Sequence, residues 1–190
     1  MLASITPLGE RGRRSNWWVT VTAFLLAATA AGAAGGALLG GLGAVAWPAH
    51  LRLTVLLVAI AAALVVDGLP GSVPGPRRQV DERWLDEYRG WVYGAGYGAQ
   101  LGLGVTTVVS SAATYVAMLA AFLTASAPAG AIVLGCYGAV RGLTPLAAAG
   151  VRSQRRLLEF HRGLARWRAR ARWGAVAAQA GILVLALALS

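Results

Sequence analysis

The sequence predicts an all-α fold: a polytopic integral membrane helix bundle of about five transmembrane helices with two amphipathic cytoplasmic segments. Of its 190 residues, 57% are hydrophobic and 13% are charged, which leaves too little polar surface to solvate a globule of this size. From Trp91 to Thr124 no side chain is charged. A stretch well over about 18 residues without charge is typical of a bilayer span.

Five apolar stretches follow one another along the chain. They cover residues 17–46, 51–66, 91–124, 128–149 and 174–190. The first and third stretches are longer than a bilayer needs, so each must tilt, bend or project from it. Each is either one helix or an interrupted one, and a hairpin or re-entrant break in the glycine-rich segment 32–43 is an alternative for the first.

The N-terminus has some features of a signal peptide. Arg11, Arg13 and Arg14 precede the first apolar stretch, and the tripeptide 28–30 (Ala-Thr-Ala) resembles a cleavage site. The apolar run continues well past that site. We therefore expect a signal anchor that stays as the first helix.

Basic residues are distributed asymmetrically between the segments that join the stretches. The arm before Trp17 carries three arginines, segment 68–90 carries four and segment 151–173 carries eight, whereas the two intervening turns carry only Arg52. By the positive-inside rule the N-terminus is cytoplasmic and, with five spans, Ser190 lies outside. This pattern predicts a protein of the bacterial cytoplasmic membrane, and it explains the net charge of +10 without nucleic acid.

Two parts of the chain are similar to each other. Segment 83–90 aligns with 156–163, segment 67–69 aligns with 141–143, and Trp17 aligns with Trp91. We therefore expect one membrane domain, 1–190, built from two parallel units around an axis along the membrane normal, with chance similarity as the alternative. Its parts are a cytoplasmic arm (1–16), two two-helix units that each end in an amphipathic segment (17–90 and 91–173), and a last helix (174–190).

The amphipathic segments favour a position in the headgroup plane. Trp84, Leu85 and Tyr88 share one face of a helix, and charged residues cover much of the rest. The second segment is the more basic, and its arginines would attract anionic lipid by about 1 kcal/mol per residue near the surface. An acidic cytoplasmic partner is the alternative.

Glycines recur at every fourth position at the start of the third stretch. Small residues at this spacing make a helix face flat enough for another backbone to approach closely. We expect this row to form a helix contact, either within the chain or between protomers of a homo-oligomer or with a partner membrane protein. The row comprises Gly90, Gly94, Gly98 and Gly102.

Polar groups inside the spans are the candidate functional residues. Asp67 and Arg141 occupy equivalent ends of the second and fourth stretches, which predicts an ion pair that is either a structural clamp or a gate. A polar stripe is expected on the third stretch, where it would bond neighbouring helices or line a hydrophilic pathway. Its members are Gln100, Thr107, Ser111 and Thr114.

The inventory of reactive side chains argues against an enzyme. His50 and His161 are predicted on opposite sides of the membrane, so they cannot share a metal within one chain. Phosphate-binding and nucleophile-elbow patterns are absent from the sequence, and Cys136 is its only cysteine. We therefore expect no catalytic residues, no metal and no cofactor.

Segment 91–104 (Trp-Val-Tyr-Gly-Ala-Gly-Tyr-Gly-Ala-Gln-Leu-Gly-Leu-Gly) resembles the glycine-rich helix starts of small actinobacterial membrane proteins grouped with the CcdA/DsbD transmembrane domain and related transporters. The resemblance covers about one helix. It implies small-solute transport or an accessory role. It does not extend to thiol electron transfer, which in that family uses a pair of membrane cysteines, and the parallel repeat also departs from that family's inverted one.

Two functions follow from these observations. One is a permease-like helix bundle for a small solute, which the polar groups at Asp67, Arg141 and the stripe favour. The other is a non-transporting accessory or scaffold subunit of a membrane complex, held to its partner by glycine faces and basic segments.

Overall fold

A computed structural model describes residues 5–46, 48–69, 73, 75, 83–104, 109 and 111–188, and the regular structure in these residues is helical. The elements are α1 (Pro7–Gly12), α2 (Trp17–Ala46), η1 (Ala49–Leu51), α3 (Arg52–Gly68), α4 (Trp84–Glu87), α5 (Gly90–Gly102), α6 (Ala113–Leu123), α7 (Ala127–Gly142), η2 (Thr144–Ala148) and α8 (Gln154–Ala188). Within the described residues, four helical segments are long and apolar enough to cross a membrane: 17–46, 49–68, 127–148 and 169–188. These findings confirm the all-α class and membrane-type helices.

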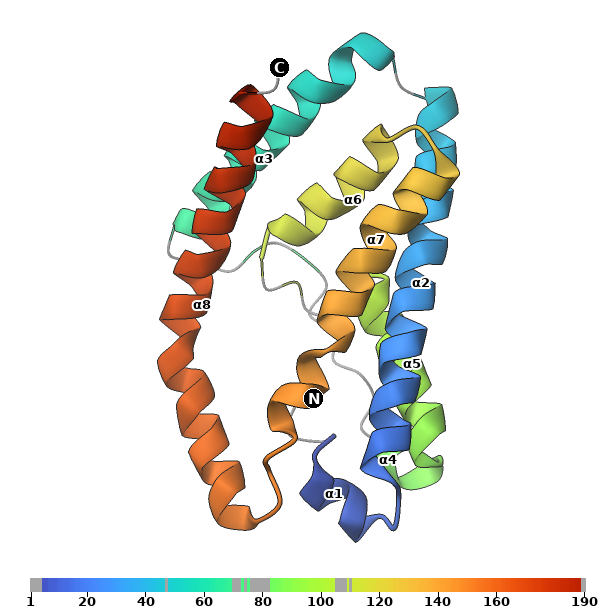
Figure 1. The fold of residues 1–190 in the computed structure, drawn as a ribbon, viewed down its shortest axis with the longest axis vertical. Coiled ribbons are helices and arrows are strands. Elements are labelled where there is room, and N and C mark those ends of the chain that lie inside the picture. The colour runs from blue at the N-terminus through green and yellow to red at the C-terminus, as the bar shows by residue number, and fades with distance from the viewer. Residues whose placement is uncertain are drawn as a thin grey trace.

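Helix α2 is the central element of the bundle, and α5 and α7 pack along it (Figure 1). The glycine row of α5 lies directly on the α2 backbone. A Cβ atom on Gly94 would lie 2.5 Å from the Thr20 carbonyl oxygen, and one on Gly98 or Gly102 would overlap the carbonyl group of Phe24 or Ala28. Because the residue numbers on α5 and on α2 both increase from one contact to the next, α5 runs parallel to α2.

Helix α7 packs on α2 from Leu25 to Gly40 and runs in the opposite direction. Gly32 lies against Leu134, Gly36 against Gly130, and Gly40 against Ser126, so the positions on α7 fall as those on α2 rise. At each contact a side chain would overlap the partner backbone. Both helices approach α2 this closely because glycine leaves the backbone uncovered, which is the usual device for membrane helix contacts.

The third apolar stretch, which the sequence left open as one helix or an interrupted one, contains two helices in the described residues, α5 and α6. Helix α5 ends at Gly102, and Gly104 has φ +79°, a left-handed conformation that glycine adopts without strain. The sequence that follows is rich in Val, Thr and Ser, which are weak helix formers. Together the two helices still extend along most of α2, because Gly90 lies against Thr20 and the Phe122 carbonyl lies against Gly43.

The sequence predicts a basic amphipathic segment, 151–173, followed by a separate last span, 174–190. The structure joins these two parts in one continuous helix. Helix α8 runs without interruption from Gln154 to Ala188. Its arginines, alanines and leucines are strong helix formers, and no proline occurs in it. The first amphipathic segment contains only the one-turn helix α4, so the two aligned segments do not share a conformation. The offset that relates Trp17 to Trp91 does relate the ends of α3 and α7, at Gly68 and Gly142.

Helices α3 and α8 form an antiparallel pair beside the bundle, and α3 also contacts α6 (Figure 1). These two helices are the least covered of the candidate spans. Only 11% of the residues in the apolar stretch of α3, and 6% in that of α8, are buried. Helix α1 lies at one end of the molecule and the last turns of α8 lie at the other (Figure 1).

Candidate functional site: a buried carboxylate at the helix break

Asp67 lies in the last turn of α3 and is only 8% exposed. Its carboxylate accepts three hydrogen bonds. The Ser111 hydroxyl donates to Oδ2 at 2.7 Å, the Ala112 backbone N–H donates to Oδ1 at 2.8 Å, and Gln179 Nε2 donates to Oδ2 at 2.7 Å. These donors come from α8 and from the segment between α5 and α6. The interruption of the third stretch therefore places polar groups beside an acid in an apolar bundle.

The donors of Asp67 are all uncharged groups. An isolated charge inside a membrane protein is expensive, and hydrogen bonds to a carboxylate offset part of that cost. Gln179 is itself 6% exposed, and among the described residues its Oε1 has no hydrogen-bond partner. The site therefore holds a carboxylate with three donors and, next to it, one buried acceptor that has no partner among the described residues.

Helix α8 also holds the end of α3 through Arg172. Its Nε donates to the Asp67 carbonyl oxygen at 2.8 Å, and its Nη2 donates to the Leu69 carbonyl oxygen. The last carbonyl groups of a helix have no partner within the helix, so a cationic donor there is favourable. Arg172 binds the backbone of this helix end, whereas Gln179 binds the side chain.

The predicted ion pair between Asp67 and Arg141 does not form, and that prediction is wrong. Arg141 Nη1 donates to the Tyr137 hydroxyl at 2.7 Å, and its guanidinium carbon lies 5.4 Å from the centre of the same ring. Helix α7 packs chiefly on α2, whereas α3 packs on α6 and α8. The two helix ends are equivalent in sequence but lie against different neighbours.

The predicted polar stripe is not one helix face, because the helix is interrupted within it. Gln100 is half-buried on α5, and Thr107 lies outside the described residues. Ser111 binds Asp67, whereas Thr114 is buried at the start of α6 and shares a 2.7 Å hydrogen bond with the Tyr137 hydroxyl. Thr114 therefore belongs to the Arg141 network and Ser111 to the Asp67 site.

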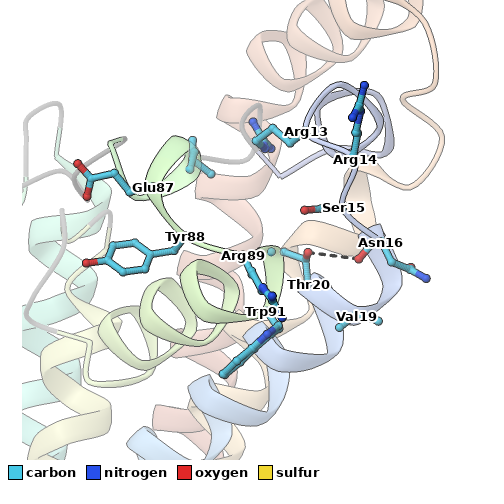
Figure 2. Close-up of a pocket in the computed structure, with 12 residues that line it drawn as sticks. Arg13, Arg14, Ser15, Asn16, Val19, Thr20, Glu87, Tyr88, Arg89 and Trp91 are labelled. Atoms are coloured by element: carbon cyan, nitrogen blue, oxygen red, sulfur yellow. Dashed lines mark hydrogen bonds between the residues drawn. The ribbon is translucent and has the colours of Figure 1, made fainter.

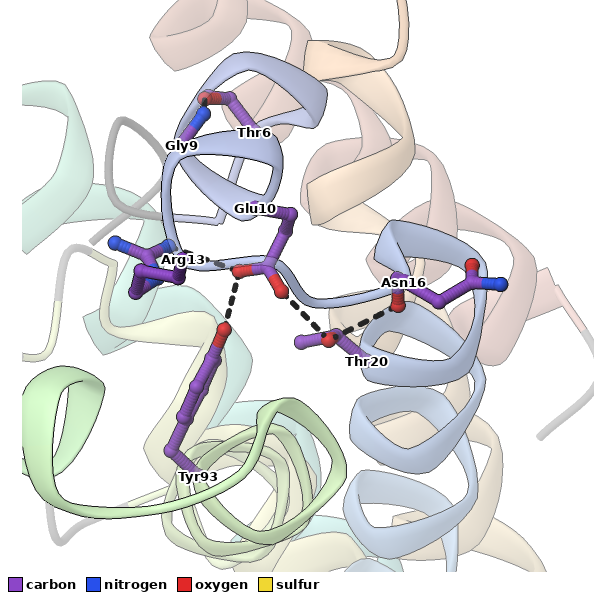
Figure 3. Close-up of polar contacts among 7 residues, drawn as sticks. All are labelled: Thr6, Gly9, Glu10, Arg13, Asn16, Thr20 and Tyr93. Atoms are coloured by element: carbon purple, nitrogen blue, oxygen red, sulfur yellow. Dashed lines mark hydrogen bonds and ion pairs between the residues drawn. The ribbon is translucent and has the colours of Figure 1, made fainter.

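A second buried carboxylate, Glu10 on α1, was missed by sequence reasoning. Figure 3 shows it between α1, α2 and α5. Glu10 is fully buried; it pairs with Arg13 Nη2 at 2.8 Å and accepts hydrogen bonds from the Thr20 hydroxyl at 2.9 Å and from the Tyr93 hydroxyl. Burial lowers the pKa of Arg13, but its hydrogen bonds to Glu10 and Tyr93 raise the pKa by more. Its guanidinium therefore stays charged.

The cluster around Glu10 fixes the N-terminal arm to the end of the bundle. Thr6 caps α1 by accepting from the Gly9 N–H at 3.1 Å, and Leu8 N–H donates to the Val151 carbonyl at 3.1 Å. Ile5 belongs to the same buried cluster as Tyr93 and Tyr97. The one signal in the sequence was that Glu10 is the only acid of segment 1–16.

The described residues contain no group of three or more His, Cys, Asp and Glu side chains that could hold a metal ion. His50 and His161 are both exposed, on η1 and α8, and Cys136 is exposed on α7.

The described residues form a helical protein with four helical segments that are long and apolar enough to cross a membrane, and two of their carboxylates are buried. Comparison of the chain with protein-family models, with curated proteins and with solved structures gives no match.

Proposed function

We propose that the protein is a permease-like helix bundle of the bacterial cytoplasmic membrane that moves a small solute, with Asp67 exchanging a proton during transport. In this role the protein is not an enzyme and needs no cofactor. It rests on one observation: Asp67 is buried beside an interrupted apolar helix and is held by uncharged donors. Interrupted helices with polar groups at the break are the usual binding-site architecture of secondary transporters.

The uncharged donors allow Asp67 to hold a proton as well as a charge. An arginine partner would favour only the carboxylate, whereas Ser111 and Gln179 each carry both a donor and an acceptor. If Asp67 is protonated and the Gln179 amide turns over, the carboxylic acid O–H can donate to Oε1, which has no partner among the described residues. Arg172 is the charged side chain that bonds to this helix end. Its guanidinium donates to the backbone carbonyls of Asp67 and Leu69 and not to the Asp67 carboxylate.

The resemblance of segment 91–104 to helix starts of CcdA/DsbD-related transporters implies the same class of function. In this proposal α5 and α6 together make one crossing of the membrane. The five crossings that follow put the two termini on opposite sides of the membrane, and the arginine distribution favours a cytoplasmic N-terminus.

The test is proton-coupled uptake in liposomes. Purified protein is reconstituted with a pH-sensitive dye in the lumen, a negative-inside potential is imposed, and a panel of amino acids, sugars and organic acids is added. We expect one class of solute to acidify the lumen with wild type and with Arg141→Gln, but not with Asp67→Asn. Solute uptake that Asp67→Asn leaves unchanged would exclude the role of Asp67, and a panel without any uptake would contradict the transport proposal.

A second candidate, a non-transporting accessory or scaffold subunit, is favoured by a different observation. The α3–α8 pair exposes large apolar side chains, among them Val58, Val65, Ile182 and Val184, whereas the glycine rows of α5 and α7 are covered within the chain. A partner membrane helix or a second copy would bind there. Photo-crosslinkers at Val58 and Ile182 should then capture one defined partner, and crosslinkers at Leu26 on α2 should not.

A further inference from the structure

A pocket of about 600 Å³ lies where α2 and α5 begin. Figure 2 shows Arg13 and Arg14 on one side of it, Asn16 and Thr20 on α2, and Arg89 and Trp91 at the start of α5. Its volume falls within the range of about 300–1,000 Å³ that is typical of small-molecule sites. Neither Asp67 nor any of its partners lines this pocket.

The lining of the pocket is basic. Arg14 and Arg89 are exposed, and neither forms an ion pair with any described acid. Arg13 is held by Glu10, and Glu87 is the only acid among the described residues that line the pocket. Arg14 has φ 55°, a left-handed conformation that is unfavourable for arginine, and the fold keeps it there. Arg14 and Arg89, which have no acidic partner among the described residues, thus line one cavity.

The helix starts add to this positive potential. Helices α2 and α5 run parallel, so both N-terminal dipole ends lie at the pocket. Asn16 accepts from the Trp18 N–H at 3.0 Å and thereby caps α2, but no side chain caps α5. An anion in the pocket would be favoured by both arginines and by both helix ends.

A second wall of the pocket is apolar. Val19 is 50% exposed and Trp91 is 53% exposed, and each belongs to a helix that continues into the apolar bundle. Trp18 and Tyr88 are exposed next to them, as aromatic side chains at a membrane interface are. A ligand that fits both walls carries an anionic head and an apolar tail.

We propose that this pocket binds an anionic phospholipid, with its headgroup phosphate on Arg14 and Arg89 and its glycerol and first acyl carbons against Trp91 and Val19. Basic pockets between membrane helices on the cytoplasmic side are the expected sites for such lipids. The site differs from the diffuse attraction of lipid to the exposed arginines of α8, because Arg14 and Arg89 line one cavity. It does not depend on transport.

The experiment measures the thermal unfolding of purified protein in a neutral detergent, with dioleoyl-phosphatidylglycerol, dioleoyl-phosphatidylcholine or inorganic phosphate added. The pocket variant carries both Arg14→Gln and Arg89→Gln. Its matched control, Arg162→Gln/Arg166→Gln, removes two exposed arginines of α8. We expect phosphatidylglycerol alone to raise the unfolding temperature of wild type and control, and the pocket variant to lose at least half of that rise.

Several outcomes would overturn the proposal. An equal rise with phosphatidylcholine would show a response to any lipid, and an equal rise with phosphate would show a free-anion site. If the α8 control lost the same part of the temperature rise, the lipid would be responding to diffuse positive charge and not to this pocket. If the Gln variant unfolds, the Arg14→Ala and Arg89→Ala single variants replace it, and native mass spectrometry counts the phosphatidylglycerol bound to each, which we expect to be less than wild type binds. Unchanged lipid binding relative to wild type in Arg14→Ala or Arg89→Ala single variants would also exclude the site.

Discussion

Tyr93 on α5 donates its phenol hydroxyl to the carboxylate of Glu10 on α1, a residue 83 positions earlier in the chain. Both side chains are fully buried, so the bond joins the N-terminal arm to the interior of the bundle. Thr20 on α2 donates to the other carboxylate oxygen. One glutamate therefore holds three elements together at the end where α2 and α5 begin.

Tyr93→Phe should destabilise the protein, because it leaves a buried carboxylate oxygen with one donor fewer. A hydrogen bond to a charged group contributes about 1.5–3 kcal/mol. For a chain of this size, about 2 kcal/mol lowers the unfolding temperature by roughly 4–8 °C. Differential scanning fluorimetry in detergent measures the shift. Tyr88→Phe, at a side chain 49% exposed, is the control and should melt like wild type; a Tyr93→Phe protein that does the same would exclude a stabilising role for this bond.

Gly98→Ala should also destabilise, since the added methyl group overlaps the Phe24 carbonyl on α2. Overpacking of this kind costs about 1–3 kcal/mol. Gly41→Ala is the matched control within a helix, because nothing lies within 4 Å of its Cβ position. It should be neutral or slightly stabilising. Thermal unfolding together with size-exclusion chromatography checks both variants, and the packing argument fails if they behave alike.

Asp67 and Arg141 should behave as independent residues. Their side chains belong to separate hydrogen-bond networks, so the effects of Asp67→Asn and Arg141→Gln on unfolding free energy should add to within about 0.5 kcal/mol. Asp67→Asn and Gln179→Leu, by contrast, should show a coupling of about 1 kcal/mol or more. A double-mutant cycle in detergent measures both couplings, and a reversed pattern would restore the ion-pair hypothesis.

Arg172→Gln should loosen α3 from α8, because two carbonyl groups at the end of α3 lose their donor. The side chain is partly exposed, so we expect a loss of about 1 kcal/mol. Arg162→Gln removes the same charge from an exposed position on α8 and should change little. Hydrogen exchange of the last turn of α3 measures the effect directly; protection equal to wild type would contradict this role.

The sequence predicted the apolar elements well and the polar contacts poorly, for a physical reason. The α2 range of 17–46 follows directly from the hydrophobic run, and the spacing of the glycines from Gly90 to Gly102 predicted a face for close contact. Which partner covers that face depends on the arrangement of all the helices. The same limit applies to Asp67: its place at the end of α3 follows from the sequence, but its burial and its donors depend on α8 and on a break that charge and hydropathy do not reveal.

The Glu10 cluster shows the limit more sharply. An isolated acid among three arginines in an N-terminal arm is typical of a solvated segment, and nothing local distinguishes it. Its burial depends on Tyr93 and Thr20, which come from two other helices. Contacts at this sequence separation carry no local pattern, whereas helix periodicity does.

The last prediction concerns the path of α5 and α6 through the membrane. Gly90 lies against the start of α2 and Phe122 lies against its end, so the two helices together should cross the bilayer once. In a Cys136→Ser background, Ala127→Cys should react with a membrane-impermeant maleimide in intact cells. Gly150→Cys, at an exposed position beyond α7, should react only after permeabilisation. Tags at the N-terminus and within segment 71–76 should be protected, and one after Ser190 should be accessible. If Ala127→Cys and Gly150→Cys react on the same side, α7 does not span the bilayer; if segment 71–76 and Ala127→Cys share a side, α5 and α6 re-enter the membrane without crossing it.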